Sequence, residues 1–192
     1  MPHKFEAKNK NKLDSDWRRE NLPPLPVLEQ LGLNPADIFA DIGCGIGYFT
    51  IPAAQFAASS SKVYALDTSA EMLAETQSRA AAAGVGNLVT VLTDEYDLKL
   101  PDETATFALL VQVLHEIDDK PLFIKEIKRL LTCGGKIAIV EWVKRPTEKG
   151  PPVDDRIGEV ETARLLAEAG FEIVGTAEIA GTFYGLTAVK KA

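Results

Sequence analysis

The sequence predicts an α/β protein with a doubly wound, mostly parallel sheet and helices on both faces. Seven short strand-like runs occur, and the first five are nearly continuously apolar, which is typical of strands that helices cover on both sides. Helical patterns separate most of the first five runs. The last two, residues 171–179 and 182–190, are separated only by Ala180 and Gly181. So short a link cannot hold a parallel crossover, so these runs must form an antiparallel hairpin.

Each element has its own signals. The predicted strands are residues 38–42, 63–67, 88–93, 106–112, 136–142, 171–179 and 182–190. The predicted helices are residues 27–31, 48–58, 68–83 with the cap included, 121–131 and 159–169. Pro52 cannot donate a backbone hydrogen bond, so the helix at 48–58 is expected to begin late or with a loosened first turn. Thr68 and Glu71 have capping-box spacing, and Gly84 is a stop signal for the same helix.

The first 26 residues are predicted to form an arm. Prolines crowd the segment between Leu22 and Val27 and fix their own φ angles, so the chain is expected to be extended until a short helix begins at Val27. The predicted organisation is an arm or lid at residues 1–26 and a single domain at residues 27–192. Residues 144–158, rich in proline and charge, form a second candidate lid.

Composition excludes several classes of function. A net charge of −7 and an isoelectric point near 5.0 argue against a nucleic-acid partner, which needs a basic face. Basic residues of the first 21 positions, Arg18 among them, alternate with acidic ones and predict a solvated arm. No apolar stretch has the length of a membrane span, so no stable membrane insertion is expected. Cys44 and Cys133 lack pairing or metal spacing, which predicts free thiols in a reducing cytoplasm and no metal site.

A glycine-rich turn and a following acidic residue predict a nucleotide-like cofactor. Residues 41–47 read Asp-Ile-Gly-Cys-Gly-Ile-Gly between a strand and a helix, and Asp67 ends the next strand. Glycines let the backbone approach a ligand, and an acidic side chain at the second strand end accepts hydrogen bonds from ribose hydroxyls. The spacing is G-x-G-x-G rather than G-x-G-x-x-G, with Asp41 two residues ahead, which favours a cationic ligand over a pyrophosphate.

With these motifs the chain resembles the class I S-adenosylmethionine-dependent methyltransferases, whose first motif is (D/E)-x-G-x-G-x-G. Three further segments keep the family's order: Asp94 followed by Leu100-Pro101, then Leu114-His115 with Asp118, then a helix ending Arg129 to Gly135. The resemblance covers roughly residues 35–142 and implies a Rossmann-like sheet with strand order 3-2-1-4-5-7-6 and the last strand antiparallel. It also implies S-adenosyl-L-methionine as the cofactor.

The resemblance assigns candidate cofactor-binding residues by position. They are Asp41, Gly43, Gly45, Gly47, Asp67, Thr68, Met72, Asp94, Glu95, Val111 and Gln112. In the family the first acid serves the methionine end of the cofactor, Asp67 matches the ribose acid, and Asp94 matches the acid that faces adenine.

Several of these positions also have a structural interpretation. Asp41 could orient loop N–H groups instead of a ligand ammonium, and Asp67 could be a solvated strand end. Asp94 could belong to a plain surface turn. Gln112 could bind the methionine end or the substrate, or cap its strand.

His115 is the candidate catalytic residue. It follows the fourth strand, and ligands of open α/β sheets bind outside the carboxyl ends of the strands. A histidine is suited to proton transfer at neutral pH, although a structural hydrogen bond is an equally good explanation.

The function that follows is methyl transfer from S-adenosylmethionine to a small-molecule acceptor. The core is most similar to the ubiquinone/menaquinone C-methyltransferases of the small-molecule branch. Two alternatives stay open. An NAD(P)-dependent oxidoreductase would use the same glycines and Asp67, and a non-catalytic methyltransferase-like subunit would keep the pocket without transferring a methyl group. The acceptor and the oligomeric state are left open by the sequence.

Overall fold

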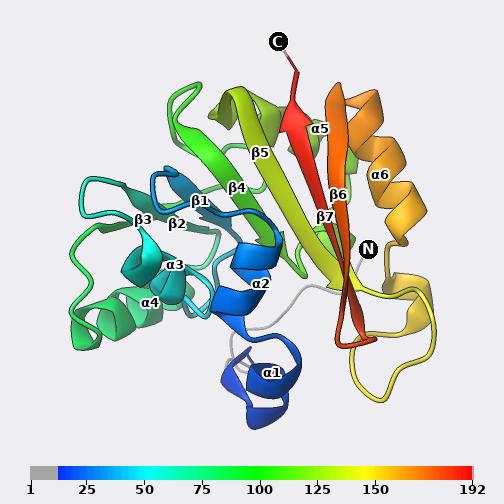
Figure 1. Ribbon diagram of the computed structural model, residues 1–192, viewed down its shortest axis with the longest axis horizontal. Helices are drawn as coiled ribbons and strands as arrows, with labels where there is room; N and C mark the ends of the chain where they lie inside the picture. The colour runs from blue at the N-terminus through cyan, green and yellow to red at the C-terminus, as the bar shows by residue number, and fades with distance from the viewer. Residues whose placement is uncertain (1–12, 192) are drawn as a thin grey trace.

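A computed structural model describes residues 13–191, which form one seven-stranded sheet (Figure 1). Its strands are β1 Phe39–Ile42, β2 Val63–Asp67, β3 Leu88–Leu92, β4 Ala105–Val111, β5 Leu131–Trp142, β6 Phe171–Ile179 and β7 Phe183–Lys190. The order is β3-β2-β1-β4-β5-β7-β6. Strands β1 to β5 pair in parallel, whereas β7 is antiparallel to both β5 and β6. The predicted fold class, strand order and closing hairpin are confirmed.

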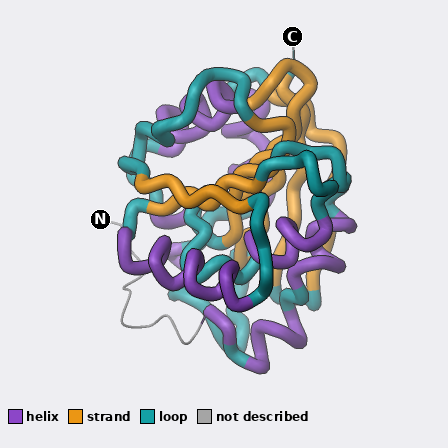
Figure 2. The backbone as a smooth tube through the Cα atoms, turned by 90° about the vertical axis from the view of Figure 1, so that its left-hand side faces the viewer, coloured by secondary structure: helices purple, strands orange, loops and turns teal. Residues whose placement is uncertain are grey.

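Helices cover both faces of the sheet, as Figure 2 shows. They are α1 Asp16–Asn21, α2 Pro24–Gln30, α3 Thr50–Phe56, α4 Ala70–Ala82, α5 Lys120–Leu130 and α6 Glu159–Glu168. Two 3-10 turns are η2 Leu114–Glu116 and η3 Val153–Asp155. Helices α2 and α3 pack with Phe107 and Leu109 of β4 in one core, and α5 and α6 pack with Ala108 and Leu110 in the other. Alternate residues of one strand therefore serve opposite layers.

The N-terminal segment differs from the prediction of an extended arm. Ser15 caps α1, its Oγ atom accepting a hydrogen bond from the backbone N–H of Arg18. Helix α2 begins at Pro24 rather than at residue 27, because proline in the first turn of a helix loses no intrahelical hydrogen bond. Helix α2 thus crosses the predicted boundary at 26, and Leu28 is fully buried. Residues 1–12 of the predicted arm lie outside the described residues.

Smaller differences occur at three element ends. Helix α3 begins at Thr50, two residues later than the predicted start, in line with the effect expected of Pro52. The cap of α4 is Ser69 and not Thr68, since the Ser69 Oγ accepts from the Met72 N–H. Strand β5 starts at residue 131 instead of 136, because its first residue already pairs with β4 ahead of a register shift.

Candidate functional site

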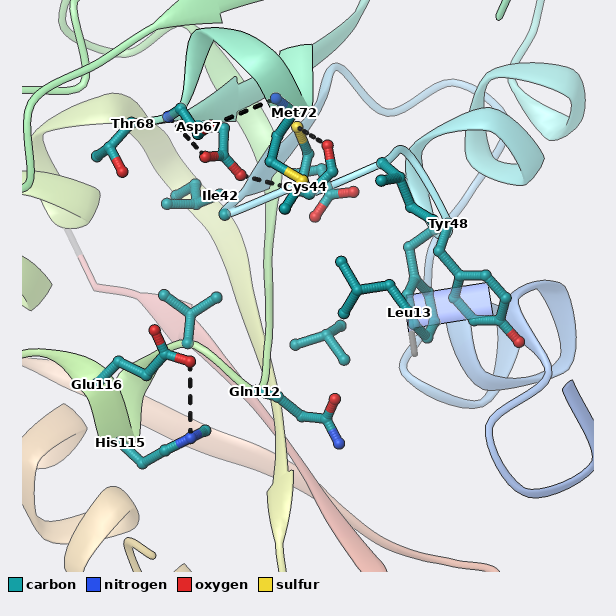
Figure 3. Close-up of a pocket in the computed structure, with 18 of the residues that line it drawn as sticks. Leu13, Ile42, Cys44, Tyr48, Asp67, Thr68, Met72, Gln112, His115 and Glu116 are labelled. Carbon is teal, nitrogen blue, oxygen red and sulfur yellow. Dashed lines mark hydrogen bonds and ion pairs between the residues drawn. The ribbon is translucent and has the colours of Figure 1, made fainter. Parts of the chain in front are cut away.

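A cavity of about 730 Å³ opens at the carboxyl ends of β1, β2 and β4. Figure 3 shows its lining, with Asp67 and Thr68 on one side and His115 and Glu116 on the other. All predicted site residues except Gly47 line this cavity. The chain therefore brings together, from four separate segments, the residues that the motifs singled out.

The glycine loop approaches the cavity closely. Gly43, Gly45 and Gly47 all have positive φ angles, of 75°, 54° and 78°. A Cβ atom on Gly43 would lie 2.5 Å from Val113 Cγ2, and one on Gly45 would lie 3.1 Å from Leu13 Cδ1. Gly47 has a different role: a Cβ there would lie 2.9 Å from Thr76 Cγ2. The third glycine thus permits packing of the loop on α4 instead of lining the cavity.

Asp67 holds the loop and the start of α4 together. Its Oδ2 atom accepts from the Gly45 N–H at 2.9 Å, and its Oδ1 atom accepts from the Ser69 N–H at 2.8 Å. Burial raises the pKa of Asp67, while these backbone hydrogen bonds oppose the rise. The side chain is not a solvated strand end. Because each carboxylate oxygen can accept more than one hydrogen bond, both still have capacity for a ligand hydroxyl.

Asp41 is buried at the end of β1, with 3% of its surface exposed. Its Oδ2 atom accepts from the Thr50 Oγ1 hydroxyl at 2.5 Å. Burial raises the pKa of Asp41 to about 7, against the opposing effect of the Thr50 hydrogen bond. A buried carboxylate with this pKa becomes more stable as an anion when a cation is placed beside it.

Gln112 turns the chain sharply after β4. Its φ of 60° is a conformation that residues other than glycine rarely adopt, and strain of this kind is concentrated at functional sites. The backbone N–H of Gln112 donates to the Val140 carbonyl at 2.8 Å. Its side chain lines the cavity and accepts a hydrogen bond from Arg18 through Oε1.

Arg18 is a cavity residue that the sequence analysis assigned to a solvated arm, and that interpretation is wrong. Helix α1 places its guanidinium in the cavity, 5.1 Å from the centre of the Tyr48 ring. Burial lowers the pKa of Arg18 to about 10, so it stays cationic at neutral pH. The signal that could have found this helix is Ser15 followed by Asp16, a cap and an acidic first turn.

His115 is buried against a carboxylate that the sequence analysis missed. Its Nδ1 atom lies 2.8 Å from Glu141 Oε2, and its backbone N–H donates to Glu141 Oε1 at 3.1 Å. Burial lowers the pKa of His115, but the hydrogen bond and charge of Glu141, with the charge of Glu116, outweigh it and the net pKa is raised. The missed signal is one acidic residue inside the apolar run of β5, since a buried carboxylate requires a partner.

Asp94 and Glu95 lie on the rim of the cavity. The Asp94 side chain is 75% exposed and forms an ion pair of 2.9 Å with Lys99 Nζ. This geometry resembles the surface turn that was the alternative to an adenine-facing acid. Deeper in the cavity, Met72 is 4% exposed.

Helix α1 and the loop after β5 both supply residues that line the cavity. The Trp17 and Trp142 rings stack with centroids 6.0 Å apart, and Lys149 Nζ lies 5.2 Å from the Trp17 ring centre. Gly150 has a φ of 111°, and a Cβ there would lie 2.8 Å from the Trp142 ring. The N-terminal segment and the loop after β5 therefore contact each other at the cavity.

Comparisons with known proteins give a family and a fold. The family model described as "Methyltransferase domain" matches residues 40–139. The demethylmenaquinone methyltransferase of Symbiobacterium thermophilum is 30% identical over 67% of this chain and 49% of its own length. The ubiquinone/menaquinone biosynthesis C-methyltransferase of Cellvibrio japonicus is 28% identical over 64% of this chain and 49% of its own length. The chain thus spans about half the length of these curated relatives.

One solved structure matches almost end to end. A SAM-dependent methyltransferase from Aquifex aeolicus superposes with a TM-score of 0.92 at 28% identity, covering 97% of this chain and 99% of that one. In residues 13–191, no helix combines the length and apolar character needed to cross a membrane.

Proposed function

The chain belongs to the methyltransferase domain family, whose model matches just over half of it, and we propose that it transfers a methyl group from S-adenosyl-L-methionine to a small-molecule acceptor. The observation that carries this proposal is the joining of the glycine loop to Asp67 by the Gly45 N–H. This hydrogen bond places the backbone of the glycine loop, which a ligand can approach closely, beside a carboxylate that can accept from ribose hydroxyls, at one edge of the cavity.

The residues present fit the cofactor. A Cβ at Gly43 would collide with Val113 and one at Gly45 would crowd Leu13, and Asp67 keeps acceptor capacity on both oxygens. Asp41 offers a buried negative charge to a cationic ligand. The cavity is also lined by Val111, Thr68 and Met72. When bound, S-adenosylmethionine would supply an activated methyl group on a sulfonium.

The protein's part in such a transfer is positioning and exclusion of water. Trp17 of α1, stacked on Trp142 at the end of β5, supports a closed site. His115 supports general base catalysis where the acceptor must lose a proton, since Glu141 accepts the Nδ1–H and Nε2, 3.9 Å from Glu116 Oε1, is the ring nitrogen that can take up a proton. His115 also borders a second, polar cavity of about 300 Å³ beside Lys120 and Glu161, which offers the proton a way out.

The relatives' names support a small organic acceptor of the quinone type, because both curated relatives act in quinone biosynthesis. The NAD(P)-dependent alternative is less well supported: the matched proteins are methyltransferases, and the spacing of the glycines is not that of a dinucleotide site. The free thiols of Cys44 and Cys133 support a reducing, cytoplasmic location.

Calorimetry with S-adenosylhomocysteine and NADH tests the cofactor directly. We expect binding of S-adenosylhomocysteine and none of NADH by the wild-type protein. Lys62→Ala, an exposed position outside the cavity lining, is the control and should bind as the wild type does. Tight NADH binding without S-adenosylhomocysteine binding would refute the proposal. A panel of quinol and phenol acceptors with radiolabelled methyl donor then tests transfer.

A further inference from the structure

Two hydrogen-bond donors in the cavity have no acceptor. They are Arg18 Nε and Gln112 Nε2, both buried and both without a hydrogen-bond partner among residues 13–191. The orientation of the Gln112 amide is fixed, because a guanidinium only donates and Arg18 must therefore face Gln112 Oε1. The amide nitrogen is then left as a free donor. Leaving such groups buried and unpaired is unfavourable, so the pair has the character of an unfilled binding site.

Arg18 also lacks a direct ion pair among the described residues, although the charges of Asp41 and Asp14 act on it. None of the ion pairs between described residues includes it, and the nearby Asp41 carboxylate is engaged with Thr50. A cation with donor atoms and no anionic partner complements an anion rather than a neutral carbonyl. A planar guanidinium matches the two coplanar oxygens of a carboxylate.

We infer that Arg18 and Gln112 form a carboxylate-binding site in the cavity. This inference rests on the proposed function and deepens it. The carboxylate has two possible sources, the amino-acid end of the cofactor or the acceptor, and the same donors would recognise either. Arg18 comes from the N-terminal helix α1, whereas Gln112 ends β4, so filling the site would also fix α1 over the cavity.

Calorimetry with two matched ligands tests the first source. S-adenosylhomocysteine carries the α-carboxylate, and its decarboxylated counterpart lacks only that group. For Arg18→Met we expect roughly 10- to 100-fold weaker binding of S-adenosylhomocysteine, the range for charge-assisted hydrogen bonds, and about equal binding of the decarboxylated ligand. Arg18→Lys keeps the positive charge but loses the planar guanidinium, so its affinity for S-adenosylhomocysteine should lie between those of the wild type and Arg18→Met. Arg19→Met is the matched control, since Arg19 is exposed and paired with Asp14.

The second source is tested with benzoate, added to the protein with and without saturating S-adenosylhomocysteine and followed by its effect on the melting temperature. Stabilisation of the wild type but not of Arg18→Met supports an acceptor carboxylate. The melting temperature of ligand-free Arg18→Met should not fall, because an unpaired buried charge has been removed.

Two results would overturn the inference. One is that Arg18→Met binds S-adenosylhomocysteine as tightly as the wild type and responds equally to benzoate. The other is equal weakening of both nucleoside ligands with a lowered melting temperature, which indicates a structural role. Failure of the wild type to bind S-adenosylhomocysteine at all would instead count against the proposed function, while the benzoate arm without nucleoside still tests the site.

Discussion

Glu141 holds His115 by two contacts: its Oε2 atom lies 2.8 Å from the imidazole Nδ1, and its Oε1 atom accepts the His115 backbone N–H. With 1% of its surface exposed, Glu141 has little freedom to turn away. The carboxylate therefore fixes both the orientation and the tautomer of the ring. Strand β5 and the turn after β4 supply the two residues, and the parallel pairing of those strands brings them together.

We predict that His115→Ala lowers the transfer rate by roughly 10²-fold or more, the usual contribution of a general base. The wild-type rate should fall as the pH drops through the histidine pKa. Steady-state kinetics across pH 5.5 to 8, about one unit either side of the ordinary histidine value, checks this. A loss confined to acceptor KM, with turnover at saturation intact, would show that His115 only shapes the pocket.

Glu141→Gln should move the midpoint of the pH–rate profile to lower pH, because only the charge of Glu116 then opposes the effect of burial on the His115 pKa. Stability gives a second readout. The His115 pKa is raised in the folded state, so the pair's contribution is fully present below the ordinary value of about 6.5 and is lost as the pH rises through the raised pKa. Urea midpoints should show a larger cost of the substitution at pH 6 than at pH 8. An equal loss of stability at pH 6 and pH 8 would contradict an effect of Glu141 on the His115 pKa.

Asp67→Ala should weaken S-adenosylmethionine binding by about 1.5 to 3 kcal/mol without unfolding the domain. The substitution removes the ribose acceptor and also frees the Gly45 and Ser69 N–H groups. Asp67→Asn retains one acceptor oxygen and should lose less. Calorimetry gives the affinities and circular dichroism verifies the fold. Unchanged affinity in both variants would remove Asp67 from the site.

Binding of the cationic cofactor should release protons near pH 7. The Asp41 pKa is raised to about 7 by burial, so the free protein carries a partly protonated carboxyl there, and a nearby cation favours the anion. Affinity should accordingly fall as the pH drops below 7. Calorimetry in two buffers of different ionisation enthalpy measures the released fraction, and Asp41→Asn should abolish it. Identical enthalpies in both buffers would show that Asp41 does not respond to the ligand.

Gly43→Ala should be more destabilising than Gly84→Ala. Both glycines have positive φ angles, of 75° and 69°, so both substitutions incur about 1 to 2 kcal/mol of backbone strain. Only at Gly43 does the added Cβ meet a neighbour, at 2.5 Å from Val113, which adds about 1 to 3 kcal/mol. Urea denaturation of the two variants separates packing from strain. Equal losses would mean that Val113 moves aside freely.

Deleting residues 1–21 should raise the cofactor dissociation rate and abolish transfer while the melting transition stays cooperative. The deletion removes Trp17 and Arg18 from the cavity but leaves the buried Leu22 and α2 in the core. Trp17→Ala should show a smaller effect of the same sign. Stopped-flow dissociation measurements check both, and a rate equal to that of the full chain would make α1 irrelevant to closure.

The sequence alone predicted the sheet and most of the residues that line the cavity at the ends of β1 and β2, because these depend on local patterns. Apolar runs with a two-residue link at Ala180-Gly181 permit few topologies, and the strand order then followed from the family resemblance. Asp41 and Asp67 end strands at positions where parallel pairing must bring them to one edge. The alternation of glycines at 43 and 45 likewise needs no distant partner to be recognised.

Tertiary structure alone decided which charges are buried and what they face. Local signals mark a helix start at Ser15 and a lone acid in the apolar run at Glu141, but they do not say which distant side chain Arg18 or Glu141 faces. Arg18 is 94 positions from Gln112, and Glu141 is 26 from His115. Such pairs form only when the layers pack, and the environment that shifts their pKa values exists only after water has been excluded between those layers. Periodicity and motif spacing report the local backbone, whereas burial is a property of the whole folded chain.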